Sequence, residues 1–443
     1  MIGRLDKLKS KVVSGDLDCD FISLYGREAL GEQKQRYLRL LETMLSQRPE
    51  AQGLMVSAPG RTELGGNHTD HNHGNVLAAA VDLDCVAAVT PIKDSAIIID
   101  SEGFTEEIRV DLGELQPVVG EEGSARSLVR GMAGMFRAEG GKVGGFHACL
   151  HATCRPGTGL SSSAAFSVLV GGILNLLYND GSFSAEKIAI MAQSAENRYF
   201  GKPCGLMDQM SSGVGRITAI DFAMPQAPKI RRIRVPDDLF GYSLVVVDTG
   251  GSHVELTPEY AAIPEEMQAA ARVLNQPVAR GLSVLQVLAA MPEIRQKAGD
   301  RAALRLLHCV EENERAVAMA HALERSDFDK FLQLAADSGE SSAMLLQNCA
   351  SQKSTTEQGV LLGLALSKRF CPNGICRVHG GGFAGTIQAY IPARELADYR
   401  RRMEHVFGLN SVISVHIGRP GICGIGMDGL EQVWCECEEK NDA

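Results

Sequence analysis

The sequence predicts an α+β protein of two domains. Its 443 residues exceed the usual size of a single core. Strand-like apolar patterns dominate residues 54–100, and long amphipathic helical patterns dominate residues 258–368 before the chain returns to strands. A stretch with prolines and several basic residues, 223–240, suits a linker or an edge strand between the halves. We therefore expect a helical lead-in over 1–50, a first domain over 51–235 and a second domain over 236–443.

The first half alternates helices and strands. Apolar residues at helical spacing between Tyr37 and Leu45 predict a helix in the lead-in. Strand patterns begin at Leu54 and recur at 75–90 and 95–100. The pattern then predicts, in order, a helix over 127–138, a strand over 146–154, a buried helix over 166–177 and a helix over 184–200.

The second half begins and ends with strands. A strand is predicted over 242–248, followed by a mainly helical block over about 258–368. Strand patterns return in ICRVHGGGFAGTIQAYI, which starts at residue 375, and a helix follows near 393–406. The segment SVISVHIG, from residue 411, predicts a further strand.

Composition and charge exclude several classes of protein. A hydrophobic fraction of 45% and a charged fraction of 22% are ordinary for a globular protein. A net charge of −10 without a long basic run argues against a nucleic-acid partner. No apolar run is long enough to span a bilayer, and the start lacks the apolar core of a signal peptide. Twelve cysteines without framework spacing fit a reducing compartment, so we expect a cytoplasmic protein that binds neither nucleic acid nor membrane.

The segment Ser57–Asn72, SAPGRTELGGNHTDHN, is the first candidate site. It places an arginine, two histidines and an aspartate among glycines and a proline, which break regular structure. Such a turn can gather polar side chains around a small polar ligand. A polar surface loop without function is the alternative interpretation.

The second candidate is Gly157–Ala165, GTGLSSSAA, between a predicted strand and an apolar helix. Exposed amides at a helix N-terminus favour an anion, and serine hydroxyls can add hydrogen bonds or bind Mg²⁺. The Walker A pattern, G-x-x-x-x-G-K-S/T, does not occur in the chain. An ordinary serine-capped helix start is the alternative.

Two further segments carry candidate residues. In Cys204–Gln209, CGLMDQ, the carboxylate of Asp208 could accept a proton from a substrate hydroxyl, and Glu196 on the preceding helix could bind Mg²⁺. In His379–Gly385, HGGGFAG, four glycines mark a backbone that something approaches closely. A nucleotide phosphate or a facing loop would both explain these glycines.

In this order, the four segments resemble the motifs of the GHMP kinase superfamily and, within it, of the galactokinase family. The family signature reads approximately G-R-x-N-L-I-G-E-H-T-D-Y-N, and its later motifs are G-x-G-L-S-S-S-A, C-G-I-M-D-Q and G-G-G-F-G-G. The helical segment HCVEENERAVAMAHAL also resembles a family helix, H-V-V-x-E-N-x-R. The resemblance spans nearly the whole chain.

The resemblance implies a fold and an activity. The fold has an N-terminal half like domain 2 of ribosomal protein S5 and a C-terminal half like ferredoxin with added helices, with the active site in the cleft between them. The activity is transfer of the ATP γ-phosphoryl group to the anomeric hydroxyl of a sugar, galactose in this family, with Mg²⁺ as cofactor. We expect a monomer whose partners are ATP and a small sugar.

The resemblance also assigns roles to residues. Asp208 matches the catalytic aspartate and Arg61 the arginine that pairs with it, while Ser163 and Glu196 match Mg²⁺-binding positions. The positions expected to contact the sugar are Asn67, His68, Asp70, Gly205 and Tyr260. Those expected to bind the ATP phosphates are Gly157, Gly159, Ser161, Ser162 and Ser163, and the glycine-rich loop contains Gly380, Gly381 and Gly382.

The departures from the signature cluster on the sugar side. Asn67 replaces a glutamate, Glu63 replaces an asparagine, and His71 replaces a tyrosine. An amide hydrogen-bonds without charge and adds a donor. A kinase of N-acetylgalactosamine, arabinose or a uronic acid is therefore an alternative, and a sensor that binds sugar and ATP without turnover is a second.

Overall fold

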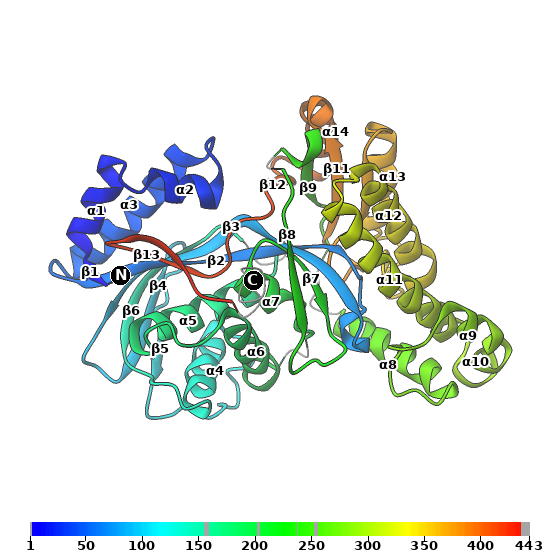
Figure 1. Ribbon diagram of the computed structural model, residues 1–443, viewed down its shortest axis with the longest axis horizontal. Coiled ribbons are helices and arrows are strands. Elements are labelled where there is room, and N and C mark those ends of the chain that lie inside the picture. Colours follow the sequence, from blue (N-terminus) through cyan, green and yellow to red (C-terminus); the bar gives the residue numbers. More distant parts are fainter. Residues whose placement is uncertain (1, 155–158, 202–203, 237, 252–255, 436–443) are drawn as a thin grey trace.

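A computed structural model describes residues 2–154, 159–201, 204–236, 238–251 and 256–435 (Figure 1). Within these residues the chain forms two β-sheets covered by helices, so the expected α+β class is confirmed. Helices α1, α2 and α3 occupy the predicted lead-in, at Leu5–Ser14, Asp18–Tyr25 and Leu30–Gln47.

The larger sheet is built around two long paired strands, β2 (Gln52–Gly65) and β3 (Asn75–Pro91). Among the described residues its main path runs β14-β13-β2-β3-β6-β4-β5, β1 pairs with β2, and β7 joins β3 to β8. The pairs are antiparallel except β4 with β6. The remaining strands are β1 (Gly3–Arg4), β4 (Ala96–Ser101), β5 (Ile108–Asp111), β6 (Phe146–Ala152), β7 (Ile217–Asp221), β8 (Lys229–Ile233), β13 (Cys423–Gly426) and β14 (Gly429–Gln432).

Both faces of this sheet are buried. Val56 and Ala87 point into a core with the helices that follow β5, whereas Met55, Val86 and Ala88 pack on α1–α3. This alternation is the period of two expected for a strand whose two faces are both covered. The helices on the first face are α4 (Ala125–Ala138), α5 (Ser162–Tyr178), α6 (Ala185–Ala195) and α7 (Met207–Val214), with the short helical turns η1 (Asp70–Asn72) and η2 (Glu196–Phe200) in the connections.

The smaller sheet has the order β10-β11-β9-β12 among the described residues, and its pairs are antiparallel. Its strands are β9 (Tyr242–Asp248), β10 (Ile375–Val378), β11 (Thr386–Pro392) and β12 (Val412–Val415). Val245 and Val247 pack with α13 (Gly359–Phe370) and α14 (Leu396–Phe407), whereas Val246 faces α11 (Asp300–Glu324) and α12 (Phe328–Ser341). The other elements of this half are η3 (Leu239–Gly241), α8 (Thr257–Val273), α9 (Val284–Ala289), α10 (Met291–Ala298), η4 (Ser342–Leu346) and η5 (Ala393–Glu395).

One hydrophobic core extends across both halves. Val56 of the larger sheet, Val246 of the smaller sheet and Phe331 of α12 belong to the same buried cluster. The chain also returns to the larger sheet near its end, because Cys423 in β13 pairs with Ser57 in β2. The domain limits expected at residues 50 and 235 stay a prediction.

A buried ionic cluster holds the lead-in on the sheet. The carboxylate of Asp84 lies 2.7 Å from Arg36 of α3 and 2.8 Å from Arg419, which precedes β13. It also accepts hydrogen bonds from Tyr25 and Ser57, each at 2.6 Å. Burial alone would raise the pKa of Asp84, but the two arginines hold it at about 2. One carboxylate thus joins α2, α3, β2 and the C-terminal return.

Candidate active site

Arg61 and Asp208 form an ion pair between β2 and α7. Arg61 Nε lies 2.6 Å from Asp208 Oδ1, and the side chains are 7% and 26% exposed. The register of β2 against β3 shifts between Pro59 and Arg61, and such irregularities redirect the side chains beside them. Burial acts to lower the pKa of Arg61, but the Asp208 carboxylate raises it above its ordinary value. The pair is therefore charged, with its carboxylate reaching solvent.

The segment before α5 wraps around this pair. Arg61 Nη1 donates to the Gly159 carbonyl at 2.7 Å, and the Arg61 amide donates to the Leu160 carbonyl at 3.1 Å. Ser161 precedes α5 with a left-handed backbone (φ 58°), and its hydroxyl donates to Asp208 Oδ2. The expected phosphate-binding segment and the expected catalytic pair thus lie in direct contact, although Gly157 lies outside the described residues.

The expected metal-binding residues lie on two elements. Ser162 and Ser163 are half-buried in the first turn of α5. Glu196 is buried in η2, a π-helical turn, and its Oε2 accepts from Gln209 next to Asp208. The other oxygen, Glu196 Oε1, is buried and has no hydrogen-bond partner among the residues that the structure describes. A buried and unpaired carboxylate oxygen is costly unless something binds it, and a hard cation such as Mg²⁺ fits this donor.

The sugar-side residues meet at η1. Asp70 begins η1, and a Cβ on Gly205 would lie 1.7 Å from Asp70 Oδ2, so any larger residue there would displace the Asp70 carboxylate. His68 Nε2 lies 3.1 Å from the Gly381 carbonyl and must donate to it, which leaves Nδ1 as an acceptor. Burial lowers the pKa of His68 to about 4, so its ring is neutral at physiological pH. Asp70 and His68 therefore offer an acidic acceptor and a neutral imidazole in one turn.

Asn67 differs from its neighbours in this turn. Its side chain is buried, and its amide nitrogen lies 2.8 Å from the Gly380 carbonyl and 3.1 Å from both carboxylate oxygens of Glu63. Its Oδ1 accepts from Asn348 at 2.8 Å. The amide expected to contact the sugar thus forms its hydrogen bonds with the protein.

The glycine-rich loop packs against protein. A Cβ on Gly381 would lie 2.5 Å from the ring of Tyr260, and one on Gly382 would lie 2.2 Å from the Asn348 carbonyl. The Tyr260 hydroxyl also donates to the Gly382 carbonyl at 2.9 Å. The sequence left two explanations for these glycines, a nucleotide phosphate or a facing loop. The contacts of Gly381 and Gly382 with Tyr260 and Asn348 support a facing protein segment.

Helix α11 carries positioning residues that motif analysis did not single out. Glu312 Oε1 accepts from the amides of Gly66 and Asn67 at 2.9 and 3.3 Å, and His308 Nε2 donates to the Asn67 carbonyl at 3.0 Å. Burial alone would raise the pKa of Glu312, but the nearby basic side chains, His308 first and then Arg315, hold it at about 2. His308 and Glu312 are four residues apart, so they share a helix face. This spacing, in a segment that resembles a helix of the family, is the sequence pattern from which the two residues could have been predicted.

His379 joins the glycine-rich loop to β2. Its Nε2 lies 3.0 Å from the Thr62 hydroxyl and its Nδ1 lies 3.1 Å from the Thr386 hydroxyl. Burial lowers the pKa of His379 to about 3, so the ring is neutral. Thr62, which follows Arg61, is therefore hydrogen-bonded to a residue from the second half of the chain.

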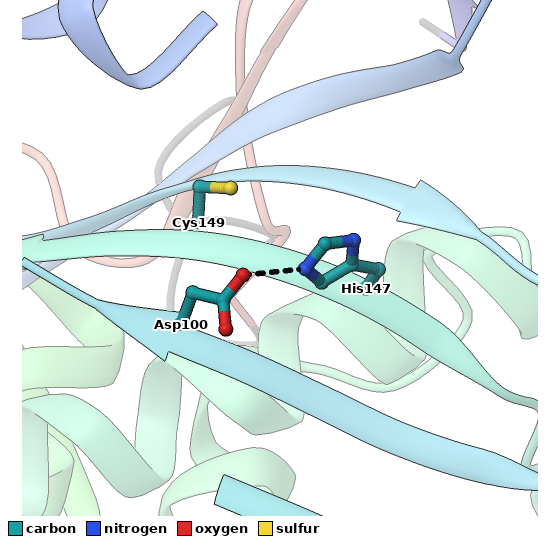
Figure 2. Close-up of side chains that lie close together, drawn as sticks. All are labelled: Asp100, His147 and Cys149. Carbon is teal, nitrogen blue, oxygen red and sulfur yellow. Dashed lines mark hydrogen bonds and ion pairs between the residues drawn. The ribbon is translucent and has the colours of Figure 1, made fainter. Parts of the chain in front are cut away.

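A second cluster, away from these residues, contains Asp100, His147 and Cys149 (Figure 2). His147 Nε2 lies 2.9 Å from Asp100, and Arg48 donates to His147 Nδ1 at 3.0 Å. Since Nδ1 accepts from Arg48, the proton is on Nε2, the atom that faces Asp100. Burial raises the pKa of Cys149 to about 12, so it remains a thiol. Metal binding requires a free imidazole lone pair and a thiolate, so we interpret this cluster as a hydrogen-bonded group.

Comparison with known proteins identifies the class to which this site belongs. Residues 127–216 match the family model of the GHMP kinases N terminal domain. The fold is similar to that of a D-glycero-D-manno-heptose 1-phosphate kinase from Bacteroides thetaiotaomicron (14% identity, 84% of this chain and 98% of that chain, TM-score 0.56). It is also similar to a mevalonate kinase from Methanococcus jannaschii (14% identity, 82% and 98%, TM-score 0.55). The fold is that of the GHMP kinases.

Within that class, residues 46–91 match the galactokinase galactose-binding signature. The fold is also similar to Lactococcus lactis galactokinase complexed with galactose (23% identity, 86% of this chain and 97% of that chain, TM-score 0.73). The chain therefore combines a GHMP kinase fold with the galactose-binding signature of the galactokinases, which are phosphotransferases acting on hydroxyl groups. Among the described helices, none has both the length and the apolar composition needed to cross a membrane.

Proposed function

We propose that this protein is an ATP-dependent sugar 1-kinase whose substrate is D-galactose. The observation that carries the proposal is the contact of Arg61 and Asp208 with both neighbouring segments. Ser161 joins Asp208 to the segment that precedes α5, and Gly205, three residues before Asp208, lies against Asp70. A sugar held at Asp70 and a nucleotide held at the start of α5 would meet at this pair.

The chemistry of the pair suits phosphoryl transfer. Asp208 accepts or shares the proton of the anomeric hydroxyl, and Arg61 keeps the carboxylate ionised and stabilises the charge that develops. The segment 159–163 and the N-terminus of α5 hold the ATP phosphates, with Ser161 orienting Asp208 and Ser162 and Ser163 facing the nucleotide. His68 and Asp70 read sugar hydroxyls, with Gly205 and Tyr260 beside them.

Glu196 and Ser163 are the residues proposed to hold Mg²⁺. The cation, when bound, neutralises charge on the transferring phosphate oxygens. The unpaired and buried Oε1 of Glu196 supports this role. The requirement for ATP suits a cytoplasmic protein, and we propose that it acts as a monomer.

An ADP-release assay with a panel of sugars tests the proposal, with the product identified by phosphorus NMR. Galactose is expected to give the highest kcat/KM and a phosphate on the anomeric carbon. A higher kcat/KM for N-acetylgalactosamine, arabinose or a uronic acid would change the substrate but keep the reaction. Sugar-dependent ATP binding without ADP release would instead indicate a sensor.

The second candidate, a kinase of a related sugar, is favoured by one observation. Asn67 stands where the galactokinase signature has a glutamate, and its amide is engaged by Glu63, Gly380 and Asn348. The segment 66–72, here called the sugar turn, therefore lacks the charge that the signature has at position 67.

A further inference from the structure

Asn67 has no hydrogen-bonding group left for a ligand. A side-chain amide offers two N–H donors and two acceptor lone pairs. The donors are directed at the Gly380 carbonyl (2.8 Å) and at both oxygens of Glu63 (3.1 Å each). The acceptor receives Asn348 Nδ2 at 2.8 Å and the Ser342 hydroxyl at 3.4 Å. The residue is 1% exposed.

The carboxylate of Glu63 is also engaged by protein groups. Arg377 Nη2 donates to Glu63 Oε1 at 2.7 Å, and the two side chains are 0% and 3% exposed. Burial raises the pKa of Glu63, and Arg377 is the largest opposing influence. Removing either partner of such a buried pair leaves a charge without compensation.

Together these two residues join the sugar turn to the second half of the chain. Glu63 and Asn67 lie on or directly after β2, whereas their partners lie in β10, in the glycine-rich loop and around η4. His68, the next residue, donates to the Gly381 carbonyl at 3.1 Å. His68 is therefore held against the same loop by its own hydrogen bond.

The two positions are also exchanged relative to the family signature. That signature has an amide followed four residues later by an acid, and this chain has the acid first, Glu63, and the amide second, Asn67. Because the two side chains are hydrogen-bonded to each other, the exchange keeps one acid and one amide in the same buried space. Either change alone would place two acids or two amides there.

We propose that Glu63 and Asn67 are a positioning pair, which fixes the sugar turn against the glycine-rich loop and does not contact the sugar. The inference rests on the proposed kinase function. A residue that contacts one hydroxyl affects discrimination at that hydroxyl, because the loss appears only with sugars that carry it. A positioning residue lowers kcat/KM for all sugars by one factor.

The experiment compares Asn67→Ala with wild type on galactose and on galactose derivatives that each lack one non-anomeric hydroxyl. We expect kcat/KM to fall about tenfold for every sugar, with an unchanged KM for ATP, since several buried hydrogen bonds are lost. The ratio of galactose to each derivative stays as in wild type. Asn175→Ala is the matched control, because Asn175 is a fully buried amide that bonds Phe183, remote from the sugar turn.

Two results would overturn the inference: a ratio that collapses for one derivative only, or an unchanged kcat/KM throughout. If Asn67→Ala does not fold, the double variant E63N/N67E is compared with its two single variants. The melting temperature and the activity of the three variants then test whether the two residues act as a pair. The double variant is expected to recover about tenfold or more over the weaker single, because one acid and one amide are restored. Losses that simply multiply would refute the pair. If wild type released no ADP with galactose, the proposed function would fail, and the melting temperatures would still test the pair.

Discussion

Arg61–Asp208 and the cluster of Asp84 with Arg36 and Arg419 use the same chemical groups in different surroundings. Asp84 is 0% exposed and has two arginines, a tyrosine and a serine around its carboxylate. Asp208 is 26% exposed and is bound by Arg61 and Ser161. A carboxylate closed in on all sides stabilises the fold, whereas one that reaches solvent can meet a substrate. Exposure, more than pairing, separates the structural aspartate from the candidate catalytic one.

The largest expected effect follows from Asp208→Asn. The amide keeps the shape of the side chain but cannot accept a proton, so kcat should fall about a thousandfold. ATP binding should stay near wild type, and the melting temperature should fall less than for a fully buried pair, because Asp208 is 26% exposed although Arg61 is buried. Turnover by the coupled assay and ATP binding by calorimetry measure both effects. A variant with near-normal turnover would remove Asp208 from its proposed role.

Asp84→Asn should have the opposite profile. It leaves the buried arginines Arg36 and Arg419 without a compensating charge, which typically costs about 3 kcal/mol of folding free energy. The kcat of the folded fraction should change little, because the carboxylate of Asp84 is held by Arg36, Arg419, Tyr25 and Ser57 and is separate from the Arg61–Asp208 pair. Urea unfolding and turnover below the transition provide the comparison. If Asp84→Asn reduced kcat while stability was kept, the distinction between the two clusters would be wrong.

The same cluster predicts how stability depends on pH. The pKa of Asp84 is lowered from 3.8 to about 2 in the folded protein, so its stabilisation is complete above about pH 4. It is lost as the pH falls towards 2, since the unfolded chain then binds the proton more readily. The loss is about 2 kcal/mol. Unfolding free energies measured across this range should fall more steeply for wild type than for Asp84→Asn.

The contrast also explains what sequence could predict. The four motifs carried local information: Asp208 lies between methionine and glutamine in CGLMDQ, and Arg61 follows a Pro-Gly pair. Strand β9 was predicted with its observed limits because YSLVVVD is apolar and β-branched. These features depend on neighbours in the chain, so a pattern can reveal them.

Long-range partners could not be predicted in this way. Nothing in the sequence around Asn67 indicates that Asn348 and Gly380 take up its amide, because those residues lie hundreds of positions away. The same holds for Arg419, which reaches Asp84 only because the chain returns to the larger sheet before β13. For Asn67 and for Asp84, the role therefore depends on which residues the fold brings next to the side chain, and residue type alone does not reveal it.

Ser161→Ala gives the smallest expected effect and tests how Asp208 is oriented. The substitution removes the hydroxyl that donates to Asp208 Oδ2 but leaves the Arg61 pair in place. The loss of one hydrogen bond to a charged group corresponds to about 1.5 kcal/mol, or roughly tenfold in kcat/KM. Ser162→Ala, one residue further along, is the matched control, and the KM for ATP separates phosphate binding from orientation. An effect on the KM for ATP alone would place Ser161 on the nucleotide side, whereas a lower kcat with an unchanged KM would support its role in holding Asp208.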